Sequence, residues 1–224
     1  MKSPLFALAL SALCLFSSKA WAFVNLNFES AVVVSNDPNF GFLDWSLAVP
    51  GWSHSSGSDT SIVYYQDIHL ASTQWFLLAD DTLSGTIGDY SLQGRYSMML
   101  HSGYASSSPS PWVDAAIWQT GLIPSGTQSF TLQAEGDFSV YVNGNLIPMN
   151  FMSGNVYTGN ISNYAGTTSE IKIAHTVPAA QYSSVLVDNI SFSTTPAPEP
   201  SRMMLLLLGL VAVMNRRLGH ASLR

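Results

Sequence analysis

Cysteine is almost absent from this sequence. The 224 residues contain one cysteine, Cys14, which lies within the apolar N-terminal segment 5–16. We expect this segment to be removed on export, which leaves the mature chain with neither a disulfide nor a thiolate nucleophile. Its stability must come from its core, with or without a bound metal ion.

Basic residues are scarce as well. All fourteen acidic residues lie between Glu29 and Glu199, where only Arg95 and Lys172 are basic. A surface of this charge repels nucleic acid and anionic lipid. Its carboxylates either bind divalent cations or only keep the domain soluble.

Catalytic motifs are missing too. The sequence has no G-x-S-x-G, no H-E-x-x-H and no G-x-x-x-x-G-K-[ST], and its scattered histidines show no metal-ligand spacing. We therefore predict a domain that is not an enzyme. A secreted hydrolase is the remaining alternative, with a triad or a carboxylate pair assembled only in space.

The N-terminus has the features of a secretory signal peptide. Lys2 is followed by the apolar segment 5–16 and by Ala20-Trp21-Ala22, an A-x-A cleavage pattern. We predict a signal helix over residues 1–22 and cleavage after Ala22 by signal peptidase. The alternative is a buried helix or a retained anchor.

The C-terminus has a different kind of apolar segment. A proline-rich linker begins at residue 196 and precedes the apolar run 203–214, which as a helix is roughly 18 Å long against about 30 Å of hydrocarbon. The run is therefore short for a permanent membrane span. Arg216 and Arg217 follow it, and positive charge of this kind stays on the cytoplasmic side.

Pro198-Glu199-Pro200, the apolar run and the arginine pair together resemble the PEP-CTERM sorting signal. The resemblance implies recognition by an exosortase, transient anchoring in the inner membrane and cleavage near the motif. It also implies delivery to the cell surface or an exopolysaccharide matrix. Residues 218–224, after the arginines, depart from the usual pattern, and an unprocessed anchor or a chance pattern is the alternative.

Between these ends, residues 23–195 are predicted to form one all-β domain. Short runs of β-branched and aromatic residues alternate with Gly, Pro, Ser and Asn clusters, and no window shows a helical period. The expected strands are residues 24–28, 61–65, 75–78, 96–101, 115–120, 129–134, 138–143, 169–175 and 185–193. Asn143-Gly144 predicts a type I′ hairpin, and the whole pattern favours a two-sheet antiparallel β-sandwich.

Four short motifs resemble landmarks of galactose-binding-like jelly-roll modules. They are Asn25-Leu26-Asn27-Phe28-Glu29, Gly94-Arg95-Tyr96-Ser97, Trp118-Gln119-Thr120-Gly121-Leu122-Ile123-Pro124 and Leu186-Val187-Asp188-Asn189-Ile190-Ser191-Phe192. The resemblance implies a jelly roll whose terminal strands lie close together. It also implies a structural calcium ion near their junction, at Glu29 and Asp188. Alternatively, the two acids only bond nearby backbone.

Two functions remain open for an exported domain of this kind. One is a surface or matrix protein that contributes to a biofilm; the other is a module that binds surface polysaccharide. Sugar binding requires an exposed aromatic ring, and Trp112 is our candidate because it lies at the Ser/Pro-rich stretch 106–111, where burial is least assured. The alternative is a tryptophan of the core, as most tryptophans in a sandwich are.

Overall fold

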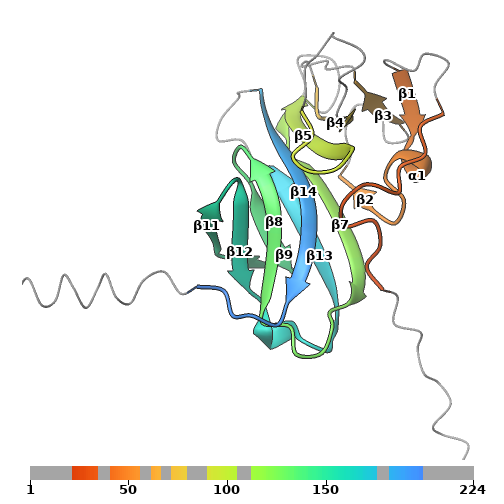
Figure 1. Cartoon of the computed structure of the whole chain (residues 1–224). Coiled ribbons are helices and arrows are strands. Elements are labelled where there is room, and N and C mark those ends of the chain that lie inside the picture. The colour runs from red at the N-terminus through yellow and green to blue at the C-terminus, as the bar shows by residue number, and fades with distance from the viewer. Residues whose placement is uncertain are drawn as a thin grey trace, which may run out of the picture.

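The computed structural model describes residues 22–34, 41–55, 62–66, 72–79, 90–104, 112–175 and 182–198. Within these segments the chain is almost entirely β, in two sheets that form a sandwich (Figure 1). The helices described are α1 (Trp45–Ala48), four residues long, and the 3-10 turn Ser162–Tyr164. The all-β prediction is thus confirmed.

Both predicted terminal helices lie outside the described residues, as do Ala20, Glu199, Pro200, Arg216 and Arg217. The described part does include Ala22 and Pro198, whose carbonyl accepts a hydrogen bond from Asn150 Nδ2 (3.3 Å). None of the helices within the described segments is long and apolar enough to cross a membrane.

The larger sheet has nine strands among the described residues. Its order is β1 (Gly41–Asp44), β3 (Ile62–Tyr65), β4 (Gln74–Ala79), β5 (Tyr96–Tyr104), β14 (Ser183–Ser193), β8 (Ser129–Glu135), β12 (Val156–Asn160) and β11 (Met149–Ser153), with β6 (Trp112–Val113) paired to β5. The last long strand, β14, therefore lies at the centre of this sheet, between β5 and β8.

The smaller sheet has five strands within the described segments. Its order is β10 (Asn145–Ile147), β9 (Ser139–Val142), β13 (Thr168–His175), β7 (Ala115–Leu122) and β2 (Ser53–His54). In Figure 1, β8 and β14 of the larger sheet lie in front of β9 and β13 of the smaller one. β2 belongs to the smaller sheet, whereas β1 before it and β3 after it belong to the larger one, so the two sheets are built from interleaved segments.

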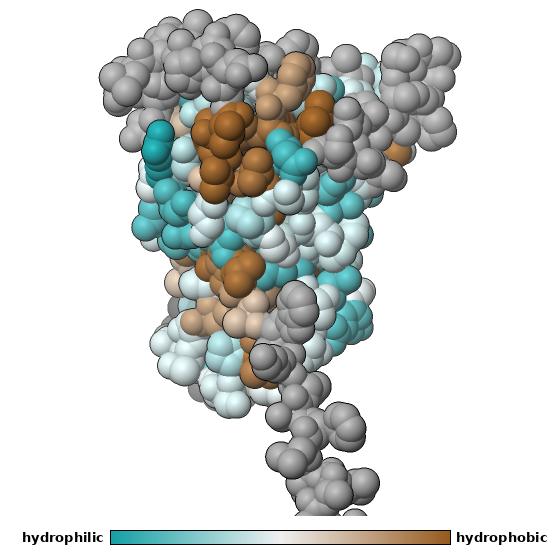
Figure 2. All heavy atoms as spheres, turned by 90° about the vertical axis from the view of Figure 1, so that its right-hand side faces the viewer, coloured by the Kyte–Doolittle hydropathy of each residue, from teal (hydrophilic) through white to brown (hydrophobic). Residues whose placement is uncertain are grey.

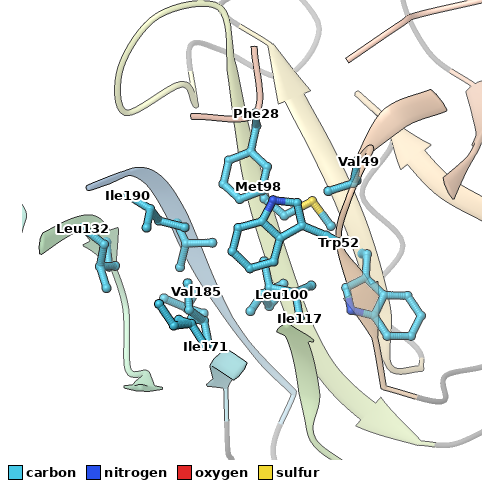
Figure 3. Packing of buried hydrophobic residues seen from close by; sticks show 14 of the residues in the cluster. Phe28, Val49, Trp52, Met98, Leu100, Ile117, Leu132, Ile171, Val185 and Ile190 are labelled. Carbon is cyan, nitrogen blue, oxygen red and sulfur yellow. The ribbon is translucent and has the colours of Figure 1, made fainter. Parts of the chain in front are cut away.

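The core lies between the sheets because successive strand residues point to opposite faces. Met98 and Leu100 of β5 and Val185 of β14 face inward and are fully buried, and they meet Ile117 and Ile171 of the smaller sheet (Figure 3). The intervening residues of β4, β5 and β14 face the outer side, where Phe76, Leu78 and Met99 form a second, separate apolar cluster.

The predicted strands from 61–65 onward are all present, but 24–28 is not a strand. Asn25 and Phe28 have φ of 50° and 56°, in the left-handed region, which breaks the pleat. The prediction of purely antiparallel sheets is also wrong for one pair of the described strands. β3 and β4 pair in parallel, with Tyr64 opposite Phe76, and such a pair needs a crossover that a strand pattern does not reveal.

The predicted hairpin is confirmed. Val142 of β9 pairs with Asn145 of β10, and the two residues between them, Asn143 and Gly144, have φ of 49° and 76°. Positive φ at both central positions is the type I′ signature, which asparagine and glycine tolerate.

The surface that carries α1, β1 and β2 is not uniformly polar. Figure 2 shows this side, with apolar surface in two areas separated by hydrophilic residues. Val32 and Leu47, joined by a hydrogen bond from Val32 N to Leu47 O (2.8 Å), are among the exposed apolar residues of the chain. The acidic composition therefore leaves room for local apolar patches.

Candidate functional site

The two predicted calcium ligands meet in one pocket. Glu29 follows the N-terminal segment and Asp188 lies within β14, yet both line the same pocket of about 100 Å³. Its other lining residues are Asn27, Gln93, Gly94 and Asn189. Three of the four motifs that resemble jelly-roll landmarks thus contribute to a single place.

Glu29 is held by backbone. Its Oε1 accepts hydrogen bonds from Arg95 N (2.7 Å) and Tyr96 N (3.0 Å). Gly94 makes this approach possible, because its φ is +69° and a Cβ at that position would collide with Glu29 Oε1. These contacts use Oε1 alone.

Asp188 is fully buried and bonded at both oxygens. Its Oδ2 accepts from Gln93 N (3.1 Å) and Ser97 Oγ (2.8 Å), and its Oδ1 accepts from Asn189 N (2.6 Å). The register between β14 and β8 shifts between Asp188 and Ser191, and Asn189 has φ of 46°. This bulge sets the direction of the carboxylate, as bulges beside functional sites do.

Among the described residues, no ion pair compensates the two carboxylates of the pocket. Burial raises the pKa of Asp188 from 3.8 to about 6; its three hydrogen bonds oppose the rise, and the negative charge of Glu29 adds to it. The Arg95 guanidinium lies over the Tyr96 ring, 5.1 Å from the centroid. A bound cation would stabilise the ionised form of both acids.

The donor set suits a hard cation. Calcium takes six to eight oxygens from carboxylates, carbonyls, amides and water. In the described part of the chain no three His, Cys, Asp or Glu side chains gather to hold a metal, so the two carboxylates need help from the Asn27 amide, backbone carbonyls and water. A volume of about 100 Å³ suits an ion with a few waters and is too small for a sugar ring.

Glu29 reaches this pocket because the segment before it is clamped without being a strand. Gln119 of β7 accepts from Val24 N (2.6 Å) and donates to Val24 O (3.0 Å), while Trp52 Nε1 donates to Asn25 O (3.0 Å). Ile190 N of β14 donates to Leu26 O (2.9 Å). The first described segment therefore lies beside the last strand, β14, as expected, although the segment itself is not a strand.

Trp112 lies in a second place, with different neighbours. Its ring centroid is 4.6 Å from that of Tyr104 and 5.1 Å from that of Tyr182, and all three rings are at least partly exposed. We call Tyr104, Trp112 and Tyr182 the aromatic rim. Tyr182 also stacks on His101, with centroids 6.0 Å apart and an interplanar angle of 9°. The sequence pattern did not indicate that these residues meet.

Comparison with known proteins yields structural likeness only. No protein-family model matches this chain, and no curated protein matches it. A solved structure of the Stig cyclase Fisc from Fischerella sp. TAU, in complex with (3Z)-3-(1-methyl-2-pyrrolidinylidene)-3H-indole, is 14% identical with a TM-score of 0.49. The match covers 80% of this chain and 98% of the cyclase chain.

Two further cyclase structures from Fischerella sp. TAU are similar to the same degree. One is 14% identical, with a TM-score of 0.45 and coverage of 76% of this chain and 94% of the other. The second, in complex with 4-(1H-indol-3-yl)butan-2-one, is 14% identical with a TM-score of 0.49, covering 80% and 98%.

These matches correct one prediction. The domain was expected not to be an enzyme because catalytic motifs are missing, but the solved structures similar to it are cyclases. Missing sequence motifs do not decide whether a domain is an enzyme, because catalytic groups can also come together only in the folded chain. At this level of identity and TM-score, the likeness assigns no reaction or ligand to this chain.

Proposed function

We propose that this chain is an exported, exosortase-sorted protein of the cell surface or extracellular matrix, contributing to a biofilm or exopolysaccharide matrix. We further propose that its sandwich is a jelly roll stabilised by a calcium ion bound at Glu29 and Asp188. Export and sorting rest on the two ends of the sequence. The observation that carries the calcium site is the meeting of two carboxylates in one small pocket, where burial raises the pKa of one of them, Asp188.

Calcium and export support each other. Extracellular calcium modules bind with dissociation constants of about 10⁻⁴ to 10⁻³ M, which suits a site with two carboxylates and several neutral oxygens. A chain without disulfides gains from a metal that ties its first segment to β14. Glu29 and Asp188 come from these two parts.

The test is thermal unfolding of the full chain with calcium or with chelator. At pH 7 and about a hundredfold excess of calcium over its dissociation constant, we expect Tm to rise by roughly 5–10 °C.

The folded state raises the pKa of Asp188 from 3.8 to about 6, so at pH 5 a proton occupies Asp188 in the folded protein and competes with calcium. The calcium-induced rise in Tm should therefore be clearly smaller at pH 5 than at pH 7.

Asp188→Asn should abolish this rise, whereas Glu170→Gln, which changes an acid on β13 away from the pocket, should leave it unchanged. An equal Tm with calcium and with chelator at pH 7 would show that Glu29 and Asp188 are not metal ligands. Their role would then be to accept hydrogen bonds from the backbone.

A polysaccharide-binding role is the second candidate. The observation that favours it is the aromatic rim, where Trp112 is joined by Tyr104 and Tyr182 and where Tyr182 is 47% exposed. Aromatic rings of this kind stack against the apolar faces of sugars.

A further inference from the structure

A polar pair lies directly beneath the aromatic rim. His101 of β5 and Ser184 of β14 are cross-strand partners, and His101 Nδ1 and Ser184 Oγ are 2.7 Å apart. His101 alternates with Leu100, which faces the core, so His101 points to the outer side of the sheet. It is 1% exposed, whereas Ser184 is partly exposed. The buried imidazole is therefore hydrogen-bonded to the side chain of a partly exposed residue.

The aromatic rim lies next to the Ser184 hydroxyl. Tyr182 covers His101 by stacking and stands two residues before Ser184 on the same chain segment. Trp112 packs on Tyr182 at 5.1 Å and on Tyr104 at 4.6 Å. A ring surface and a fixed hydrogen-bonding group thus lie next to each other, which is the pairing that a sugar requires: an apolar face to stack and hydroxyls to bond.

The charge around this surface selects among polysaccharides. Neither the three rim residues nor Ser184 carries a charge at neutral pH. Arg95 lies just before β5, whose opposite end is Tyr104, and Lys172 is on the smaller sheet over Tyr141. A uronate or sulfate polymer would meet an acidic domain in which neither Arg95 nor Lys172 lies at the described part of this surface.

We propose that the aromatic rim together with Ser184 is a binding site for an uncharged polysaccharide. This inference rests on the second candidate function and names its site and ligand class. Trp112 and Tyr182 stack on pyranose rings, and Ser184 Oγ bonds a sugar hydroxyl. His101 is a positioning residue that fixes Ser184 Oγ from below.

The experiment measures binding of the full chain to immobilised glucan, galactan, mannan and alginate. We expect binding to at least one of the three neutral polymers and none to alginate. Tyr182→Ala and Ser184→Ala should each weaken that binding by about tenfold or more. Phe151→Ala is the matched control, since Phe151 is an aromatic residue of β11 that is 62% exposed, and it should leave binding unchanged.

His101 is tested by rescue. His101→Ala should weaken binding about as much as Ser184→Ala, whereas His101→Asn should restore most of it, because the asparagine amide can bond Ser184 Oγ from about the place of Nδ1. Thermal unfolding of each variant shows whether it is folded. Equal binding by the Ala and Asn variants would remove the positioning role.

The outcomes separate the site from the function. If Trp112→Ala abolishes binding to a neutral polymer while Tyr182→Ala and Ser184→Ala bind as the wild type does, the polysaccharide function stands and this site is wrong. Stronger binding to alginate than to the neutral polymers overturns the ligand class. Binding to none of the four polymers overturns both the site and the second candidate function.

Discussion

The Glu29–Asp188 pocket and the aromatic rim lie toward opposite ends of β5 and differ in almost every property. Ser97, which donates to Asp188, and Tyr104 of the rim are seven residues apart on the strand, roughly 23 Å. The pocket is small and polar, and three distant segments must meet to make it. The rim is broad and aromatic, with exposed rings.

This difference suggests that the pocket stabilises the fold and that the aromatic rim binds a ligand. The pocket joins the N-terminal segment to β14, so substitutions there should lower the free energy of unfolding of the whole domain. The rim residues are partly exposed and lie outside the main core, so changes there should affect binding more than folding. Three substitutions test this division, and they are given in order of decreasing effect.

Asp188→Ala should have the largest effect, lowering the free energy of unfolding by about 2–4 kcal/mol at pH 7 with calcium present. The substitution leaves Gln93 N, Ser97 Oγ and Asn189 N without their acceptor and removes a proposed calcium ligand. Urea unfolding measures this. A change below about 0.5 kcal/mol would mean that the pocket does not stabilise the fold.

Gly94→Ala should cost less, about 1–3 kcal/mol, because alanine is strained at a φ of +69° and its Cβ collides with Glu29 Oε1. Gly126→Ala is the control: Gly126 has a φ of +80°, but a Cβ there meets open space. The difference between the two variants isolates the collision. Only Gly94→Ala should also weaken calcium binding in a titration followed by Tm, and equal behaviour of both variants would contradict this role of Gly94.

Tyr182→Ala should have the smallest effect on stability, within about 1 kcal/mol, because its side chain is 47% exposed. The rise in Tm caused by calcium should be the same as in the wild type, since separate sites contribute additively. Comparing melting curves of the two proteins with calcium and with chelator measures this. A loss of the calcium response would show that rim and pocket are coupled and that the division is wrong.

Much of the fold was predictable because local patterns agree with it. The strands rich in β-branched and aromatic residues formed where expected, and Asn143-Gly144 formed its hairpin because the turn depends on two residues only. Strands such as β6 and β11 were missed. They are short, and pairing with a neighbour rather than their own composition makes them strands.

The candidate site was predictable in part. Glu29 and Asp188 were chosen from motifs, and the structure brings them together. Gln119, which clamps the first segment, carries no local signal for this role, because its partner Val24 is 95 residues away. Trp112 was named from the sequence, but its meeting with Tyr182 was not predicted, since the two residues come together only through the pairing of β14 and β6 with β5.

The sequence by itself determined the all-β class, the lack of disulfides in the part after Cys14 and the acidic charge, because composition and short-range periodicity decide these properties. Only the tertiary structure decided that the segment before Glu29 is a clamped coil, that Asp188 is buried beside it, and that His101, Ser184 and Tyr182 share one surface. These features depend on contacts between residues far apart in the chain, and the register of β14 between β5 and β8 sets them.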